Sequence, residues 1–422
     1  MADVLAKLFQ ALSPLVLHGP SSGPSICRGG TYCQRTPFSG RLTGPPACRM
    51  KHLMEPLNII HSEWSNGWGG QEIRILDECL GMAQRGHRVA LCGCPEGQLG
   101  AAAQRAGLVF HPLAMRGPWD LAAVRRLVAL LRRERTQVLH THSSVDAWVG
   151  GLAARWAGVA SLRTRHLSAP VPRHPLNFVY RLPQAVVTTG QGIRRHLVED
   201  YGLDPERVVS IPTGIDCQRF APRPPEKALA AELNLPFGAP VVAIVAILRS
   251  WKRHDLFLHM ARALADQRPQ PVFLIVGGGP QEGPVRGLVQ ELGLGERVVM
   301  AGMRPDVERI LPLCQVCVLA SDKNEGVPQA VLQELACERA VVAARAGDVG
   351  QVIQHEQTGL LVPAGDAGAL AAAVGRLLDD EPLRRRLGQA GRALVQQGYS
   401  RQAMLLATEA IYAKVLAGRR RA

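Results

Sequence analysis

The sequence predicts an α/β protein with two doubly wound parallel sheets, and three observations lead to this fold class. From about residue 56 onward, short apolar runs typical of buried strands alternate with amphipathic segments typical of helices. The alternation restarts after the Pro-rich segment 221–225, which is interpreted as a linker. With 422 residues the chain is long enough for two such domains. Strands that are separated by helices favour parallel sheets covered by helices on both faces.

In the first half, the predicted strands are LNIIHS, RVALCG, QVLHTHS, SLRTRHLS, AVVTTG and VVSIPTG. The predicted helices there cover residues 72–85, 121–135 and 146–157. In the second half, the predicted strands are PVVAIVAIL, PVFLIVGGG, RVVMAG, CVLAS, AVVAAR and GLLV. Helices are predicted over 254–267 and, at the end of the chain, over Tyr399–Leu416. These patterns predict domains over 55–222 and 223–398, followed by a terminal helical segment over 399–422.

The first 49 residues differ from the rest of the chain. They are rich in Gly, Pro, Ser and Arg and show no sustained periodicity, so residues 1–49 are predicted to be a disordered extension. Met50 and Met54 stand just before the first strand, and one interpretation is a translation start assigned too far upstream.

The composition of the chain limits the classes of partner and site that are expected. The net charge of +14 favours anionic partners such as phosphates or acidic lipids, but no basic stretch is interleaved with stacking aromatics, so nucleic acid is not expected. No apolar run reaches the length of a membrane span. Cys314 and Cys317 form a C-x-x-C inside an apolar strand without a second pair, which favours buried thiols over zinc or redox chemistry.

Ligands of open α/β sheets bind at the carboxyl ends of the strands, and glycines follow two predicted strands there. Gly69 and Gly70 stand between the first strand and a helix, where backbone N–H groups can approach a phosphate. Gly278 and Gly279 end a strand of the second half. A tight turn explains either glycine pair almost as well.

Charged residues follow two further strands. Arg249 and Lys252 come after the strand 240–248, where cations could neutralise a diphosphate leaving group; a solvated basic loop is the alternative. Glu325 follows CVLAS and precedes a helix, so its carboxylate could hold sugar hydroxyls while the amides of Gly326 and Val327 face phosphate. The alternative for Glu325 is a simple helix cap.

Histidines complete the set of candidate residues. His140 and His142 lie on one predicted strand and point to the same side of it, and His166 ends the next strand. No set of His, Cys and Asp has metal-ligand spacing, so neither a metal nor another cofactor is expected.

Three motifs together resemble the family 4 retaining glycosyltransferases of the GT-B fold over residues 56–418. They are NEGVPQAVLQELA, which is similar to the E-x7-E block of that family, the segment IPTGID-x-x-RF, and the GGG strand end. The resemblance implies two Rossmann-like domains that face each other across a cleft, with the last helix crossing back to the first domain. It also implies metal-independent transfer of a hexosyl or related group from a nucleotide-diphosphate sugar, with retention of the anomeric configuration.

The resemblance implies roles for individual residues. Glu325 would orient the donor sugar, Lys252 would bind the donor phosphates, and His166 would contact the transferred sugar, with His142 as a second candidate. The remaining donor-binding candidates are Gly69, Gly70, Gly278, Gly279, Gly326, Val327, Gln333 and Glu334.

Two departures from the family pattern are visible. The second glutamate of the family falls on Gln333, and Glu334, one place later, would point about 100° away on a helix. The family arginine falls on Ile247, so Arg249 is expected to substitute for it. These departures keep a non-catalytic partner subunit open as an alternative. A GT-B nucleotide-sugar epimerase or a glycan phosphorylase is another, because these enzymes also place two Rossmann-like domains around a cleft. An NAD-dependent oxidoreductase is disfavoured because G-x-G-x-x-G is absent.

The acceptor in such enzymes meets the first domain, where the predicted helix 121–135 is strongly basic. Basic amphipathic helices can lie on anionic membranes, so a lipid-linked or lipopolysaccharide-type glycan acceptor is expected, at the inner face of the cytoplasmic membrane in a bacterial-type cytoplasm. A solvated helix face is the alternative. The sequence leaves open the nucleotide base, the sugar and the linkage. The arginines on this predicted helix are Arg125, Arg126, Arg132, Arg133 and Arg135.

Overall fold

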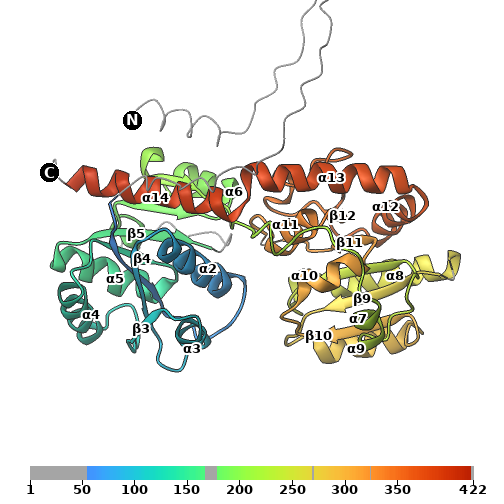
Figure 1. Ribbon diagram of the computed structural model, residues 1–422, viewed down its shortest axis with the longest axis horizontal. Coiled ribbons are helices and arrows are strands. Elements are labelled where there is room, and N and C mark those ends of the chain that lie inside the picture. The colour runs from blue at the N-terminus through green and yellow to red at the C-terminus, as the bar shows by residue number, and fades with distance from the viewer. Residues whose placement is uncertain (1–54, 167–177, 269, 324, 420–422) are drawn as a thin grey trace, which may run out of the picture. The chain divides into compact units, whose positions relative to one another are not determined.

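Two parallel sheets with their helices make up the computed structural model, which describes residues 55–166, 178–268, 270–323 and 325–419 (Figure 1). The predicted extension 1–49 lies outside these residues. The first sheet has seven strands in the order β3-β2-β1-β4-β5-β6-β7, and the second has six in the order β10-β9-β8-β11-β12-β13. Neighbouring strands pair in parallel in both sheets. The predicted α/β class with two doubly wound sheets is therefore confirmed.

The strands of the first sheet are β1 (Asn58–Glu63), β2 (Arg88–Gly93), β3 (Val109–Pro112), β4 (Val138–Thr141), β5 (Ala160–Arg165), β6 (Ala185–Thr188) and β7 (Val208–Ser210). Those of the second are β8 (Val241–Val245), β9 (Val272–Val276), β10 (Val298–Gly302), β11 (Val316–Leu319), β12 (Ala340–Ala344) and β13 (Leu360–Val362).

The helices that follow the strands of the first sheet are α2 (Gly70–Gln84), α3 (Gln98–Arg105), α4 (Leu121–Arg133), α5 (Ser144–Ala157) and α6 (Gln191–Arg195). Those associated with the second are α7 (Lys227–Glu232), α8 (His254–Gln267), α9 (Glu282–Glu291), α10 (Val307–Ile310), α11 (Gln329–Ala336), α12 (Ala367–Asp379) and α13 (Glu381–Gly398), and the last helix is α14 (Arg401–Arg419).

Two local predictions were wrong. No strand was predicted over Val109–Pro112, yet β3 forms the edge of the first sheet. Its residues are half-buried or exposed, so this strand lacks the apolar run that marks a buried one. The basic helix was predicted to include Arg135, but α4 ends at Arg133 and Arg135 adopts a φ of 49° beyond it. That left-handed conformation ends the helix.

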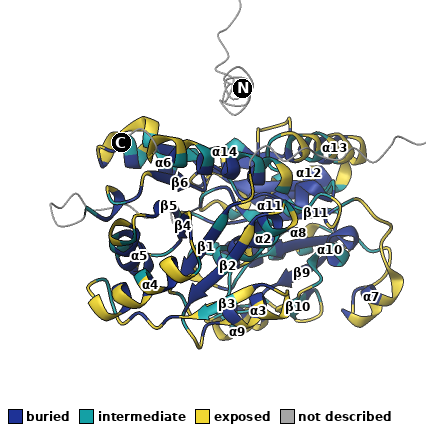
Figure 2. Ribbon diagram, turned by 60° about the vertical axis from the view of Figure 1, so that its left-hand side comes forward, coloured by how far each residue is buried: buried dark blue, intermediate teal, exposed yellow. Residues whose placement is uncertain are grey.

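The second sheet shows why its strands are apolar on both sides. Along β8, Val241 and Ala243 pack into one hydrophobic cluster, whereas Val242 and Ile244 pack into another on the opposite face. Figure 2 shows the inner strands in the buried colour, the edge strand β3 in the colours of less buried residues, and exposed residues on the outer helices. Helices on both faces thus remove the sheet from water, as expected for parallel strands.

Helix α14 packs against elements of the first sheet although it lies at the end of the chain. Its Glu409 carboxylate accepts hydrogen bonds from the Arg85 guanidinium at 2.6 and 2.7 Å, and the His87 ring lies 3.1 Å away. Residues from Pro56 onward form one compact unit. Among the described residues, no helix has both the length and the apolar character needed to cross a bilayer.

The strand order reverses direction once in each sheet, between β1 and β4 and between β8 and β11. The loops that leave two neighbouring strands at such a point diverge to opposite faces and open a crevice at the carboxyl ends. The two reversal points are therefore where the fold places ligand sites.

Candidate active site

A partly buried ion pair lies at the reversal point of the second sheet. Lys252 ends a short 3-10 turn after β8, and Glu325 follows β11, the neighbour of β8. The Lys252 Nζ donates to the Glu325 Oε1 over 2.6 Å, and the two side chains are only 18% and 7% exposed. The two residues that the sequence assigned to the donor site from segments 73 positions apart are thus in direct contact.

The backbone of Glu325 is held by the turn after β12. The Asp348 N–H donates to the Glu325 carbonyl oxygen at 3.1 Å. Gly347 has a φ of 50°, and a Cβ at this position would overlap the same oxygen. The Asp348 carboxylate in turn accepts the Gly192 N–H from α6 at 2.8 and 2.9 Å. This turn therefore positions Glu325 and links it to a helix of the first sheet.

The Arg249 side chain lies against a neighbouring tryptophan. Its exposed guanidinium lies 5.2 Å from the centroid of the Trp251 ring. Both residues line a cavity of about 430 Å³, together with Arg253 and Asp322, which form an ion pair at 3.0 Å. The structure thus places Arg249 on the wall of this cavity, whereas Lys252 contacts Glu325.

The predicted glycine loops have different surroundings. Gly69 is the N-terminal cap of α2, and a Cβ on Gly70 would lie 3.4 Å from the side-chain oxygen of Gln329 in α11. The start of α2 therefore approaches the helix that follows Glu325. Gly279 has a φ of 154°, and its Cβ would lie 2.6 Å from the Leu248 carbonyl oxygen, so a tight turn by itself requires this glycine.

Gln333 and Glu334 lie on different sides of α11. Gln333 is half-buried, whereas Glu334 is 2% exposed. Burial raises the pKa of Glu334 to about 8, against the opposing effect of Lys252, so its carboxyl group is mostly neutral at pH 7. Of the two residues, Gln333 is therefore the more exposed to solvent.

The histidine candidates lie at the reversal point of the first sheet. The His142 Nδ1 is 3.2 Å from the His166 Nε2. The Thr189 hydroxyl donates to the His166 carbonyl oxygen at 3.4 Å, and a Cβ on Gly326 would lie 3.3 Å from that hydroxyl oxygen. Thr189 thus lies between His166 of the first sheet and the segment that carries Glu325. Gly326 is half-buried and Val327 is buried.

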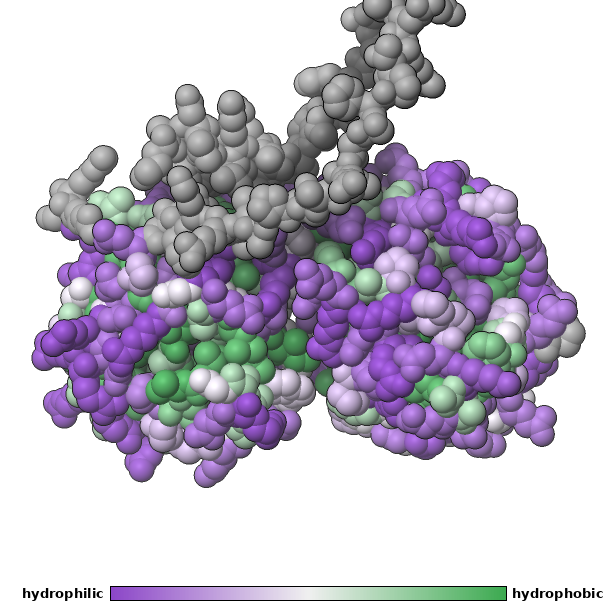
Figure 3. All heavy atoms as spheres, viewed as in Figure 1, coloured by the Kyte–Doolittle hydropathy of each residue, from purple (hydrophilic) through white to green (hydrophobic). Residues whose placement is uncertain are grey.

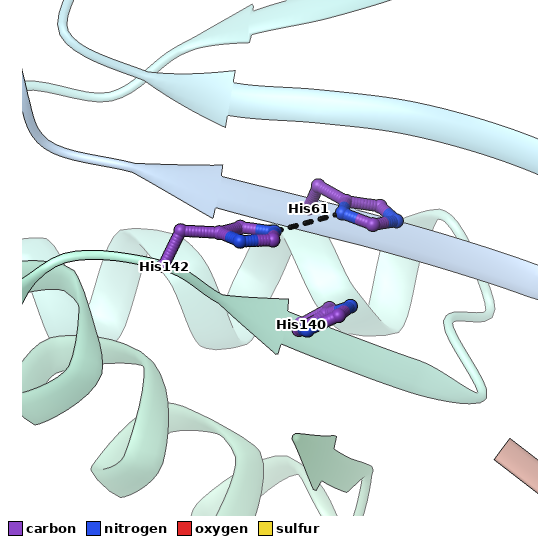
Figure 4. A group of neighbouring side chains, drawn as sticks. All are labelled: His61, His140 and His142. Carbon is purple, nitrogen blue, oxygen red and sulfur yellow. Dashed lines mark hydrogen bonds between the residues drawn. The ribbon is translucent and has the colours of Figure 1, made fainter. Parts of the chain in front are cut away.

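Two further histidines, His61 and His140, lie beside His142. His61 on β1 pairs in register with His140 on β4, and both rings are buried with that of His142 (Figure 4). One ring nitrogen of each lies within 4.8 Å of those of the other two, so the three imidazoles are close enough to be considered as metal ligands. Their ring nitrogens are, however, within hydrogen-bonding distance of one another and of neighbouring side chains.

Two family models match successive parts of the chain. The model described as "Glycosyltransferase Family 4" matches residues 68–219, and the model described as "Glycosyl transferases group 1" matches residues 226–394. Together they cover the strands of both sheets except β1 and leave only a short segment between them. The chain belongs to the family 4 glycosyltransferases.

Similar proteins include several glycosyltransferases. The UDP-Gal:alpha-D-GlcNAc-diphosphoundecaprenol alpha-1,3-galactosyltransferase of Escherichia coli is 28% identical over 63% of this chain and 72% of its own length. The D-inositol 3-phosphate glycosyltransferase of Nocardia farcinica is 28% identical over 76% of this chain and 79% of its own length. The protein of that name from Acidothermus cellulolyticus is also 28% identical, and the match covers 61% of this chain and 63% of the relative.

Solved structures with this fold include a glycosyltransferase from Rickettsia africae, with a TM-score of 0.78 and 20% identity over 86% of this chain and 99% of its own. HepE from Anabaena, solved in complex with UDP and glucose, has a TM-score of 0.75 and 17% identity over 85% of this chain and 100% of its own. At this identity the likeness shows the fold, and the glycosyltransferase therefore has the GT-B fold.

Sequence reasoning missed three residues of this glycosyltransferase site. Gly347 and Asp348 follow β12, and the Ala-Gly-Asp that begins at Ala346 after a buried strand was the available signal. His61 ends an apolar run, but nothing local distinguishes it from a core histidine. Only the register of β1 and β4 brings it beside His140.

Proposed function

We propose that this glycosyltransferase transfers a hexosyl or related group from a nucleotide-diphosphate sugar, with retention of the anomeric configuration and without a metal ion. The observation that carries the proposal is the contact between Lys252 and Glu325 at the point where the second sheet reverses its strand order. A cation and a carboxylate are thus paired where the fold binds its ligand. The family resemblance of the segment around Glu325 assigns the same roles to the two residues.

The chemistry follows from the two charges. As the bond between sugar and diphosphate breaks, negative charge grows on the departing phosphate, and the Lys252 ammonium can stabilise it without a metal. The Glu325 carboxylate can accept hydrogen bonds from sugar hydroxyls and so orient the anomeric carbon. The N-terminus of α2, capped by Gly69, adds positive potential for the phosphates. Gly70, Gly278, Gly326, Val327 and Gln333 complete the proposed donor-binding set.

The proposed acceptor is a lipid-linked or lipopolysaccharide-type glycan. The name of the Escherichia coli relative states that its acceptor is a sugar on diphosphoundecaprenol. An acceptor of this class would place the reaction at the inner face of the cytoplasmic membrane.

A panel of UDP-, GDP- and ADP-sugars tests the donor proposal. In the presence of a chelator, one nucleotide is expected to raise the melting temperature, because a ligand that binds only the folded state stabilises it. Its sugar should be released slowly by hydrolysis, and NMR of the first product formed should show the anomeric configuration of the donor.

Each other outcome contradicts part of the proposal. An inverted product would refute retention, and hydrolysis that needs added Mg²⁺ or Mn²⁺ would refute metal independence. Stabilisation by one nucleotide without turnover, even with added lipid-linked glycans, would favour a non-catalytic subunit. The absence of any response to the panel would refute the transferase proposal.

A basic and partly apolar surface on α4 and α5 supports membrane association. Arg125, Arg126, Arg132 and Arg133 are exposed on α4. Large apolar side chains are exposed beside them: Trp119 at 62%, Leu121 at 52% and Trp156 at 52%. The Arg132 guanidinium donates to the Trp156 carbonyl oxygen, so the two helices present one surface. Figure 3 shows hydrophilic residues at the outer edge where Figure 1 draws α4, with apolar residues gathered beside them toward α3. Basic side chains beside exposed tryptophans are typical of surfaces that bind anionic membranes.

Reversing two of these charges should weaken membrane binding. Each basic residue near an anionic surface contributes about 1 kcal/mol, so Arg125→Glu/Arg132→Glu is expected to reduce vesicle binding by at least about tenfold. Flotation with phosphatidylglycerol vesicles at low ionic strength measures the bound fraction. Vesicles of phosphatidylcholine alone should bind little protein.

The matched control is Arg286→Glu/Arg385→Glu, which makes the same change in net charge at two exposed arginines of α9 and α13. It should bind nearly as well as the wild type. Equal loss in both double variants would mean that net charge, and not this surface, causes binding. No flotation of the wild type would refute membrane association.

A further inference from the structure

A line of buried polar rings runs from α14 to the candidate active site. It starts at Tyr412, which is fully buried in α14. The Tyr412 hydroxyl oxygen lies 2.9 Å from the His140 Nδ1 and 3.4 Å from the His61 Nε2. The last helix of the chain thus contacts the histidines at the carboxyl ends of β1 and β4.

The line continues through the other rings. The His61 Nδ1 is 2.9 Å from the His142 Nε2, as the dashed line in Figure 4 shows, and the His142 Nδ1 is 3.2 Å from the His166 Nε2. On the other side, the His140 Nε2 is 2.7 Å from the Thr164 hydroxyl oxygen. Both ring nitrogens of His61, His140 and His142 therefore have a hydrogen-bonding partner.

These hydrogen bonds account for the three rings without a metal. The His140 and His142 rings are stacked, with centroids 4.4 Å apart and planes inclined by 29°. The lone pairs of an imidazole lie in the ring plane, so stacked rings direct theirs side by side instead of toward one point. A shared Zn²⁺ would also break the hydrogen bonds that these nitrogens make.

Each ring in this line is neutral. Burial lowers the pKa of His61 to about 3 and holds the pKa of His140, His142 and His166 far below the usual range. A neutral imidazole has one N–H donor and one acceptor nitrogen. Each ring that donates on one side must therefore accept on the other, and all the bonds point the same way along the line.

Two directions satisfy this rule, and they leave His166 in different tautomers. If Thr164 donates to His140, then Tyr412 donates to His61, and each later ring donates to the next. The His166 Nε2 then accepts, so its proton lies on Nδ1. In the opposite direction the His166 Nε2 donates to His142, and Nδ1 is an acceptor.

A carboxylate beside the line favours the first direction. The Glu78 Oε1 lies 3.4 Å from the His140 Nδ1, and the Arg74 guanidinium lies 3.7 Å from the other Glu78 oxygen. Burial raises the pKa of Glu78 to about 7, against the opposing effect of Arg74, so the carboxylate form prevails above about pH 7. In this ionised form, Glu78 attracts the proton of His140 to Nδ1. His140 then accepts from Thr164 at Nε2, which sets the direction that ends with Nδ1–H on His166.

We propose that Tyr412 and His140 are positioning residues that act through His61 and His142 to hold His166 in the Nδ1–H tautomer. This ring would then offer a hydrogen-bond donor to an oxygen of the transferred sugar. That last step rests on the proposed function, whereas the tautomer itself does not. Holding one tautomer in advance matters because a ring with the proton on the wrong nitrogen cannot make the bond that orients the substrate.

The variant Tyr412→Phe tests the proposal, because it removes one hydroxyl and keeps the ring. In the full-length wild type, ¹⁵N NMR with histidine labelling should show His166 protonated at Nδ1, the signal being assigned with His166→Gln. In Tyr412→Phe both tautomers should appear. If donor turnover is observed, kcat should fall about fivefold, as for one lost uncharged hydrogen bond, with little change in KM for the donor.

Tyr201→Phe is the control, since it removes the hydroxyl of another buried tyrosine, whose ring packs against Tyr180. It should leave the His166 signals and kcat unchanged. The Nε2–H tautomer in the wild type would overturn the proposal even if Tyr412→Phe failed to fold. So would an unchanged His166 spectrum in Tyr412→Phe, or one Zn²⁺ per chain that is lost in His142→Gln. A wild type that transfers no sugar would refute the proposed function and leave the tautomer measurement intact.

Discussion

Replacing Glu325 by glutamine is expected to lower kcat by about 100-fold to 1000-fold, the range observed when one preorganised electrostatic group is removed from an active site. The Glu325 carboxylate contacts the Lys252 ammonium at 2.6 Å, and glutamine keeps the size and an acceptor oxygen but removes the charge. Folding should suffer far less, because glutamine can still accept the Lys252 hydrogen bond. Steady-state kinetics with the donor found in the nucleotide panel measures the effect.

The control is Glu282→Gln, which makes the same chemical change at an exposed ion pair with Arg286 on α9. Exposed pairs of this kind contribute little, so kcat and the melting temperature should stay near the wild-type values. For Glu325→Gln, a shift in melting temperature of about 4 °C or less would be small enough to exclude unfolding as the cause. Unchanged kcat in Glu325→Gln would contradict the role assigned to this carboxylate.

Replacing Gly347 by alanine is expected to reduce both stability and turnover. The residue has a φ of 50°, which is unfavourable for alanine, and the added Cβ would overlap the Glu325 carbonyl oxygen. The turn must move, and with it the Asp348 N–H that binds this oxygen. Strain of this kind costs about 2 to 4 kcal/mol, and a displacement of Glu325 by about 1 Å can lower kcat about 100-fold.

Gly350→Ala is a close control, because it makes the same substitution three residues away where a Cβ meets open space. Thermal unfolding and donor turnover should both remain near wild type in this variant. If Gly347→Ala had wild-type activity, the turn after β12 would not be needed to position Glu325. If Gly350→Ala failed as well, general sensitivity of the segment would explain the result.

The strand ends were predictable because they are local features. Lys252 and Glu325 each follow an apolar run and precede a helix, and the carboxyl ends of parallel strands lie at one edge of a sheet. The sequence pattern therefore predicts both residues at that edge without knowledge of the fold. It does not predict that Arg249, three residues before Lys252, lies against Trp251, because loop side chains are oriented by their packing.

The edge strand β3 illustrates the limit of sequence patterns. Val109 is 56% exposed, and the strand has only four residues, so neither burial nor length marks it. It forms because β2 offers a free edge whose backbone groups must be paired. A short edge strand of this kind forms because a neighbouring strand is present in the folded protein. Its own residues therefore show no pattern from which the strand could be predicted.

The sequence by itself determined the α/β class, the family resemblance and the two charged residues at the reversal point of the second sheet. These follow from periodicity and from motifs a few residues long. The tertiary structure decided which distant residues meet: His61 with His140, Gly347 with Glu325, and Tyr412 with the histidines of the first sheet. Strand order and the return of α14 depend on burying apolar surface across the whole chain, so no local pattern specifies these contacts.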